Sequence, residues 1–163
     1  MGCVAAVLVL TWALATPATW TIFDEQAYLT QALRFADGDP FPAAPQIAGV
    51  SLPGPRMLVD DAGRQVPEFA LGWPLLLAPA AAAGPITAFA LVLLMHLLGT
   101  AAFVGVLRRL GLREAWALLY LLHPTAVLLS RTAMADVPTM AATALGLYAW
   151  LDPRRPSRGA LLA

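Results

Sequence analysis

The most constraining feature of this sequence is an apolar run at residues 85–107, which carries no charged side chain and has His96 as its one ionisable group. A helix needs about 20 such residues to cross a bilayer, because its backbone groups must bond to each other where no water is present. Residues 3–23 form a second run of this kind. We therefore expect both segments to be membrane-spanning helices.

The composition agrees with a membrane protein. Hydrophobic residues make up 60% of the chain and charged residues 12%, and the mean hydropathy is +0.71, which is outside the usual balance of a soluble domain. The formal net charge is zero and no basic patch interleaved with aromatics occurs, so the sequence gives no sign of a nucleic-acid partner. With Cys3 as its single cysteine, the chain can form no intrachain disulfide or cysteine metal cluster.

Two further apolar segments, residues 115–130 and 137–151, are shorter and enclose a turn that holds Arg131 and Asp136. We expect them to be spans three and four, joined at a membrane interface. Residues 159–163 have the composition of the start of a fifth span. The predicted fold is an all-α polytopic membrane protein, a single transmembrane region over residues 1–163, and the front part of a longer chain.

The N-terminal run has an alternative interpretation as a secretory signal peptide. A signal peptide has a basic segment before its apolar core, whereas no Lys or Arg precedes Arg34 in this chain. We therefore favour a membrane anchor over a cleaved signal.

Arginine placement predicts the orientation of the spans. Arginines follow the second and fourth spans, at positions Arg108, Arg109, Arg113, Arg154, Arg155 and Arg158. Because basic residues are enriched on the cytoplasmic side, these ends are expected to be inside the cell and the loop at 24–84 outside. The predicted location is the inner (plasma) membrane, with several passes and membrane lipids as neighbours.

The outer loop has internal structure of its own. Apolar residues from Tyr28 to Ala36 recur at helical spacing, which predicts an amphipathic interfacial helix. Residues 41–56 are rich in proline and small side chains and are expected to be coil, whereas residues 57–66 predict a hairpin around Ala62-Gly63. Residues 72–79 are too short to span and are expected to lie flat on, or re-enter, the outer leaflet.

Three carboxylates stand where apolar segments meet polar ones. Asp24 and Glu25 follow the first span, and Asp136 precedes the fourth. Acids this close to hydrocarbon are often functional, although Asp24 and Asp136 are also suitably placed to be helix N-caps. Both interpretations stay open on the sequence alone.

Cationic and aromatic side chains near these acids have structural and functional interpretations too. Arg131 either snorkels to the interface or holds a phosphate with paired donors. His96 and His123 share no metal-ligand spacing and are expected to pack or to form hydrogen bonds.

Taken in order, five features resemble a known family: Asp24-Glu25 after a span, an amphipathic stretch with Tyr28, the run at 66–79, the Leu-Arg-Arg-Leu-Gly ending of a span at 107–111, and the Ser-Arg-Thr-Ala-Met-Ala-Asp-Val-Pro stretch at 130–138. Together they resemble the N-terminal part of bacterial family 39-like glycosyltransferases. These are relatives of protein O-mannosyltransferases and aminoarabinose lipid A transferases with the GT-C membrane fold. The chain departs from many relatives at residues 69–72, where they carry His-Pro-Pro or Tyr-Pro-Pro.

The resemblance implies transfer, with inversion, of a sugar from a polyprenyl-phosphate carrier to a hydroxyl of a lipid, glycan or protein acceptor, outside the cytoplasmic membrane. By the same resemblance Asp24 is the base, Glu25 and Asp136 support it, and Arg131 and Tyr28 bind substrate. A divalent metal ion is the cofactor considered, with Asp24 and Glu25 as its candidate ligands. Two alternatives remain: a transporter subunit, which would place ionisable groups at mid-membrane, and a non-catalytic membrane assembly protein.

Overall fold

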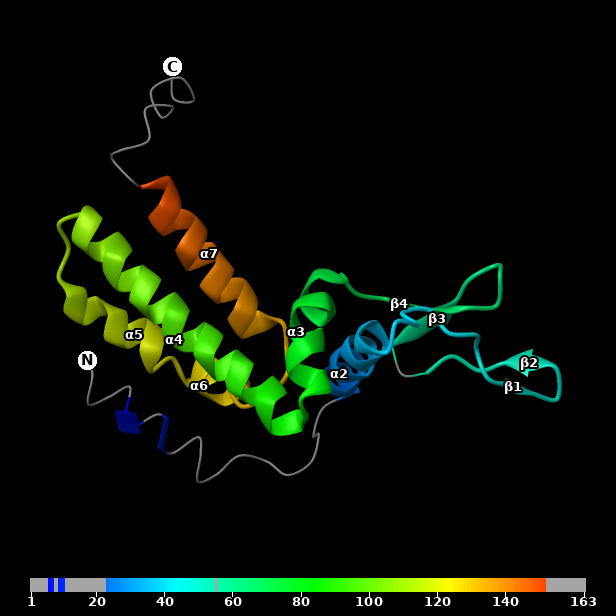
Figure 1. The fold of residues 1–163 in the computed structure, drawn as a ribbon. Coiled ribbons are helices and arrows are strands. Elements are labelled where there is room, and N and C mark those ends of the chain that lie inside the picture. Colours follow the sequence, from blue (N-terminus) through cyan, green and yellow to red (C-terminus); the bar gives the residue numbers. More distant parts are fainter. Residues whose placement is uncertain (1–5, 8, 11–22, 55, 152–163) are drawn as a thin grey trace, which may run out of the picture.

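The structure is a computed structural model, and it describes residues 6, 7, 9, 10, 23–54 and 56–151. Within them the chain forms an elongated molecule with two ends (Figure 1). Helices α4 (Pro85–Arg109), α5 (Ala117–Leu121), α6 (Pro124–Leu129) and α7 (Asp136–Trp150) lie together at one end. Helices α2 (Phe23–Ala36) and α3 (Gly72–Ala82) and two hairpins form the other.

Helix α2 confirms the predicted amphipathic helix. Asp24 and Glu25 occupy its first turn and Arg34 its last, so the charges complement the helix dipole. Its apolar stripe, including Leu29 and Ala32, is buried against α3. The packing explains the helix better than propensity does, because an isolated helix of this length is marginal in water.

Two hairpins follow α2. Strands β3 (Met57–Val59) and β4 (Gln65–Pro67) pair antiparallel, which confirms the hairpin predicted around Ala62-Gly63. Strands β1 (Gln46–Ile47) and β2 (Val50–Ser51) form a second hairpin where coil was predicted. Its turn residues Ala48 and Gly49 have φ of 50° and 79°, as a tight two-residue turn with two left-handed positions requires.

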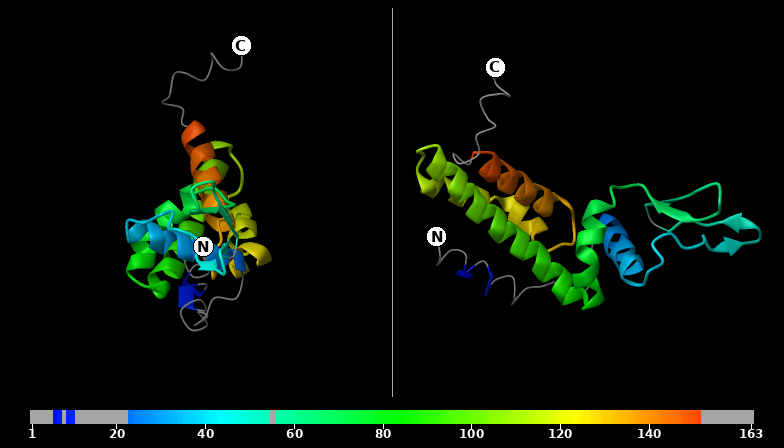
Figure 2. Two further views of the ribbon diagram at one scale, coloured as in Figure 1. Left: turned by 90° about the vertical axis from the view of Figure 1, so that its right-hand side faces the viewer. Right: turned by 45° about the horizontal axis from the view of Figure 1, so that its top comes forward.

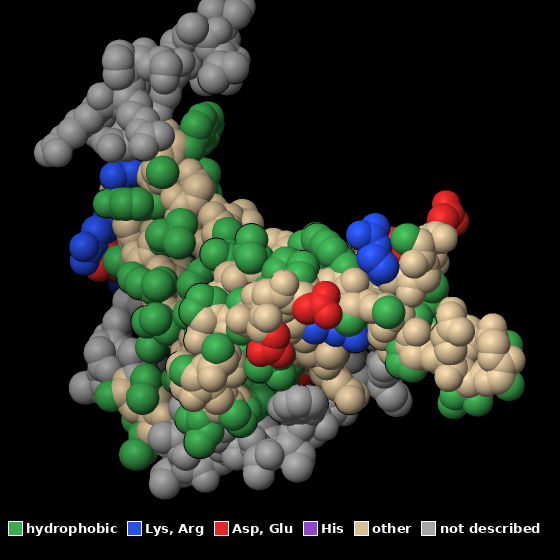
Figure 3. All heavy atoms as spheres, turned by 45° about the vertical axis from the view of Figure 1, so that its right-hand side comes forward, with side chains coloured by type: hydrophobic (Ala, Val, Ile, Leu, Met, Phe, Trp, Pro, Cys, Tyr) green, Lys and Arg blue, Asp and Glu red, His purple; other side chains and the backbone are tan. Residues whose placement is uncertain are grey.

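Helix α3 packs into the core rather than standing alone. Trp73, Leu77, Ala78 and Ala81 are buried in one hydrophobic cluster with residues of α2 and α4. The helix is 11 residues long, so the prediction that this segment is too short to span is confirmed. Leu75 and Leu76 are exposed, and on the face drawn in Figure 3 hydrophobic side chains cover much of the surface.

Helix α4 confirms the second predicted span in length and composition. It has 25 residues, and within the described part of the chain it is the one helix long and apolar enough to cross a membrane. One side packs on α7, where glycines allow close approach: a Cβ built on Gly99 would lie 2.8 Å from the Cα of Ala141. Gly105 faces the ring of Tyr148 in the same way. The order of these contacts shows that α4 and α7 run parallel (Figure 2).

The predicted all-α polytopic bundle with a GT-C-like arrangement is wrong. The third expected span, residues 115–130, is divided into a 3-10 turn η1 (Glu114–Trp116) and the short helices α5 and α6. Proline at 124 causes the division, because it disfavours a helical residue before it and lacks an N–H. His123 is accordingly extended, with φ −57° and ψ 121°.

The fourth expected span fails on length. Helix α7 has 15 residues, about 22 Å at 1.5 Å per residue, which is short of a hydrocarbon core of about 30 Å. The two hairpins also contradict a purely helical fold. The predicted spans at 3–23 and 159–163 lie, apart from residues 6, 7, 9, 10 and 23, outside the described residues.

Candidate functional site

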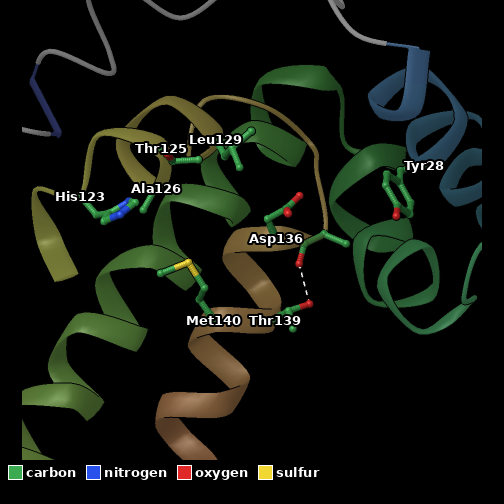
Figure 4. A pocket seen from close by; sticks show the side chains of 9 residues that line it. Tyr28, His123, Thr125, Ala126, Leu129, Asp136, Thr139 and Met140 are labelled. Carbon is green, nitrogen blue, oxygen red and sulfur yellow. Dashed lines mark hydrogen bonds between the residues drawn. The ribbon is translucent and has the colours of Figure 1, made fainter.

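A pocket of about 470 Å³ opens where the two ends of the molecule meet (Figure 4). Its walls come from α2, from α6 with the residue before it, and from the start of α7. The lining residues are Tyr28, His123, Thr125, Ala126, Leu129, Ala135, Asp136, Thr139 and Met140. The pocket therefore combines hydroxyl, imidazole and carboxylate groups with apolar side chains.

Asp136 supplies the carboxylate of this pocket. It lies in the first turn of α7, is exposed, and follows Ala135 at the N-cap position. The N-cap interpretation of Asp136, one of the two that the sequence left open, therefore does not hold. In Figure 4 its carboxylate stands between Tyr28 and the side chains of α6, while the nearby Thr139 hydroxyl donates to the Ala135 carbonyl at 2.7 Å. The helix dipole stabilises the negative charge of an acid at this end of a helix.

The loop that leads to Asp136 is fixed at one residue, Ala133. The backbone N–H of Ala133 donates to Oε1 of Glu25 at 2.9 Å, and the carbonyl of Ala133 accepts from the indole of Trp73 at 2.8 Å. Glu25 is only 1% exposed. A buried carboxylate requires such partners, because an unpaired charge in the interior is costly. Glu25 thus holds the loop instead of facing the pocket.

Asp24 points elsewhere and is held in a surface ion pair. Its Oδ1 lies 3.0 Å from Nε of Arg56, whose Nη1 is 3.3 Å from Glu68. Successive residues of a helix do not face the same side, which explains why neighbouring acids separate so completely. Helix α2 begins at Phe23, so Asp24 lies inside the helix rather than at the predicted N-cap position.

Tyr28 lies within electrostatic range of both Asp24 and Asp136. Its ring packs against Phe69 with centroids 4.5 Å apart. Burial raises the pKa of the Tyr28 hydroxyl, and the negative charges of Asp24 and Asp136 raise it further. Both carboxylates therefore act on Tyr28, and its hydroxyl remains a protonated hydrogen-bond donor at neutral pH.

Arg131 lies in the same loop, between Ser130 and Ala133. Its Nε is buried without a hydrogen-bond partner, and no described carboxylate forms an ion pair with it. A buried guanidinium N–H without an acceptor is costly, so this residue is suited to an anionic ligand. Arg131 lies five residues before Asp136 in the chain, but it is not part of the pocket wall.

The candidate metal ligands are not brought together. Glu25 is directed into the protein towards Ala133 and Asp24 towards Arg56. Among the described residues no group of three or more His, Cys, Asp or Glu side chains could hold a metal ion. A site made by Asp24 and Glu25 therefore does not fit this arrangement.

Three polar pocket residues were missed from the sequence: His123, Thr125 and Thr139. His96 has the hydrogen-bonding role expected of it, since its Nε2 lies 3.0 Å from the carbonyl of Leu121. His123, assigned the same role, lines the pocket instead, as does Thr139. A signal that could have revealed His123 is its place before Pro124, because the residue before a proline favours an extended backbone and interrupts the helix.

Comparison of this chain with known protein families, curated proteins and solved structures finds no match.

Proposed function

We propose that this protein is a membrane-associated glycosyltransferase, which moves a sugar from a polyprenyl-phosphate donor to an acceptor hydroxyl. The observation that supports this proposal best is the meeting of Tyr28 and Asp136 in one pocket beside an apolar helix. These residues belong to separate segments, each of which resembles the corresponding family motif. The two motifs that resemble the family therefore contribute residues to the same pocket.

The pocket has the chemistry that sugar binding needs. Hydroxyl and carboxylate groups of Tyr28, Thr125, Asp136 and Thr139 can exchange hydrogen bonds with sugar hydroxyls. The apolar side chains of Leu129 and Met140 can cover the less polar faces of the ring. A volume of about 470 Å³ is within the range of small-molecule sites.

Asp136 is better placed than Asp24 to take the proton in the reaction. The acceptor oxygen forms a bond to the anomeric carbon while the bond from that carbon to the phosphate oxygen breaks, and polyprenyl phosphate leaves with the bonding electrons. Asp136 receives the hydroxyl proton, because it is exposed in the pocket wall. Asp24 does not line the pocket and is instead held in an ion pair with Arg56. Attack opposite the leaving phosphate inverts the anomeric centre.

Arg131 and Tyr28 are the groups that we assign to the donor phosphate. The buried Nε of Arg131 has no hydrogen-bond acceptor among the described residues. Guanidinium groups bind phosphate through paired donors. The protonated Tyr28 hydroxyl can add a further hydrogen bond to the departing oxygen. Both groups would stabilise the negative charge that accumulates there.

The membrane in this proposal is the inner (plasma) membrane, and α4 provides the attachment. Its exposed apolar side chains Ile86, Leu94 and Leu98 form a face suited to lipid. Arg108 and Arg109 stand at its far end, which the positive-inside rule places in the cytoplasm. Because α7 runs parallel to α4 and begins at Asp136, the pocket then opens towards the periplasm or exterior. A lipid, glycan or protein in that space would be the acceptor.

The test compares Asp136→Asn, Asp24→Asn and the control Asp61→Asn in the intact protein in membranes, with a labelled polyprenyl-phosphate sugar. Asp61 is an exposed acid in the turn between β3 and β4, away from the pocket. Loss of a positioned base lowers the rate by about two to four orders of magnitude, which we expect for Asp136→Asn alone. Unchanged transfer by this variant would refute the assignment, and an inactive Asp24→Asn variant with active Asp136→Asn would move the base to Asp24.

A further inference from the structure

A second, smaller cavity lies on another side of α2. It has a volume of about 210 Å³ and is lined by Gln26, Ala27, Thr30, Arg34, Gly54 and Met57. Gln26, Thr30 and Arg34 are spaced four residues apart, so they form one polar stripe along the helix. At about 100° per residue this stripe faces away from Tyr28, and the cavity is therefore separate from the pocket described above.

A buried glutamine organises this cavity. Gln65 is 4% exposed, and its Oε1 accepts from Nη2 of Arg34 and from the backbone N–H of Gly54, both at 3.1 Å. Nη1 of Arg34 lies 3.7 Å from the sulfur of Met57. The guanidinium is thus held in place by neutral groups from the β3–β4 hairpin and the loop before it.

Within the described part of the chain, the charge of Arg34 has no partner of opposite sign at contact distance. Among the described residues, Arg56, Arg64 and Arg108 each form an ion pair with a carboxylate, whereas Arg34 forms none. Burial lowers the pKa of Arg34, and the negative charge of Asp39 opposes that effect. A partly desolvated guanidinium with neutral ligands gains most from an added anion, because the Coulomb attraction is less screened there than in water.

We propose that this cavity binds a small anion, a phosphate or carboxylate group, through Arg34, with hydrogen bonds from Thr30 and Gln26. The volume of about 210 Å³ is below the roughly 300 Å³ at which drug-sized ligand pockets begin, so it suits a single such group rather than a nucleotide. The anion is either a free small molecule or the headgroup of a membrane phospholipid. This site is independent of the proposed sugar transfer.

Titration of the intact, detergent-solubilised protein with inorganic phosphate and with acetate, followed by calorimetry at fixed ionic strength, tests the proposal. Removing a charged hydrogen bond weakens binding by roughly tenfold or more, which we expect for Arg34→Gln. Arg64→Gln is the matched control, since Arg64 is already paired with Asp60 and is outside the cavity. Saturable binding by the natural protein that Arg34→Gln retains would overturn the proposal, as would the absence of saturable binding of either anion.

A second variant keeps the test valid if Arg34→Gln disturbs the hairpin. Thr30→Val removes a hydroxyl from the cavity but leaves the bond between Arg34 and Gln65 intact, and it should weaken anion binding several-fold; unchanged affinity would remove Thr30 from the site. To separate the two sources, the protein is placed in bilayers of phosphatidylglycerol or of phosphatidylcholine. Competition between phosphatidylglycerol and added phosphate indicates a headgroup site, and its absence indicates a free small anion.

Discussion

Replacing Glu25 with alanine removes one of the two hydrogen bonds that hold Ala133, in the loop that carries Arg131 and leads to Asp136. The backbone N–H of Ala133, which now donates to Oε1 of Glu25 at 2.9 Å, would remain buried without that acceptor. An unsatisfied buried donor costs about 1–3 kcal/mol, and loss of one packed methylene group adds about 1 kcal/mol, so we expect a decrease of about 2–4 kcal/mol in unfolding free energy. Glu25→Gln keeps an acceptor oxygen and should cost about 1 kcal/mol.

Hydrogen exchange and denaturant unfolding measure this effect. In the natural protein the amide of Ala133 should exchange slowly, whereas in Glu25→Ala exchange over residues 130–136 should become markedly faster. Trp73→Phe, which removes the donor to the Ala133 carbonyl, is the paired variant. Because both variants act on the backbone of one residue, Ala133, their effects should be non-additive by about 0.5–3 kcal/mol. Unchanged exchange and stability in Glu25→Ala would show that the hydrogen bond from Ala133 to Glu25 does not hold the loop.

Three further predictions concern other parts of the structure. Tyr28→Phe should weaken donor binding while leaving the unfolding free energy nearly unchanged, since the ring contact is kept and only the hydroxyl is lost; donor titration beside thermal unfolding would show this. Gly99→Ala should destabilise the α4–α7 packing by about 1–3 kcal/mol, because the new Cβ would lie 2.8 Å from the Cα of Ala141; denaturant unfolding measures it, and a neutral effect would contradict the close packing. Asp60 has a lowered pKa, caused first by its hydrogen bond from the backbone of Arg64. Its contribution to the β3–β4 turn is therefore present above the usual carboxyl pKa of about 4 and lost as pH falls through the lower folded value. Amide chemical shifts followed against pH should show this, and Asp60→Asn should abolish the transition.

Local chemistry was sufficient for several elements. The apolar spacing from Tyr28 to Ala36 predicted α2, and the Ala62-Gly63 turn predicted the hairpin of β3 and β4. The long uncharged run at 85–107 predicted α4. These features depend on residues close together in the chain, so a pattern of a few positions carries the information needed to form them.

The break after α5 had a local signal in the sequence, Pro124, but the prediction gave more weight to the apolar residues around it. Pro124 marks a helix boundary, but the surrounding run of apolar residues favoured one continuous span at 115–130. In the structure His96, from α4, stands beside the carbonyl of Leu121, which a continuous helix would have bonded to a later N–H. A polar side chain from another helix thus provides a partner for the interrupted backbone. Hydropathy alone could not predict this contact, because it depends on how the two helices pack.

Sequence alone determined that Asp24, Glu25 and Asp136 stand beside apolar segments, and with them the class of chemistry to expect. It could not determine their separate roles, because neighbouring acids on a helix differ only in the side to which they point. The packing of α2 on α3 turned Glu25 inward to Ala133 and left Asp24 with Arg56. The tertiary structure also joined Tyr28 to Asp136 in one pocket, since a contact between distant segments depends on how whole helices fill the space between them.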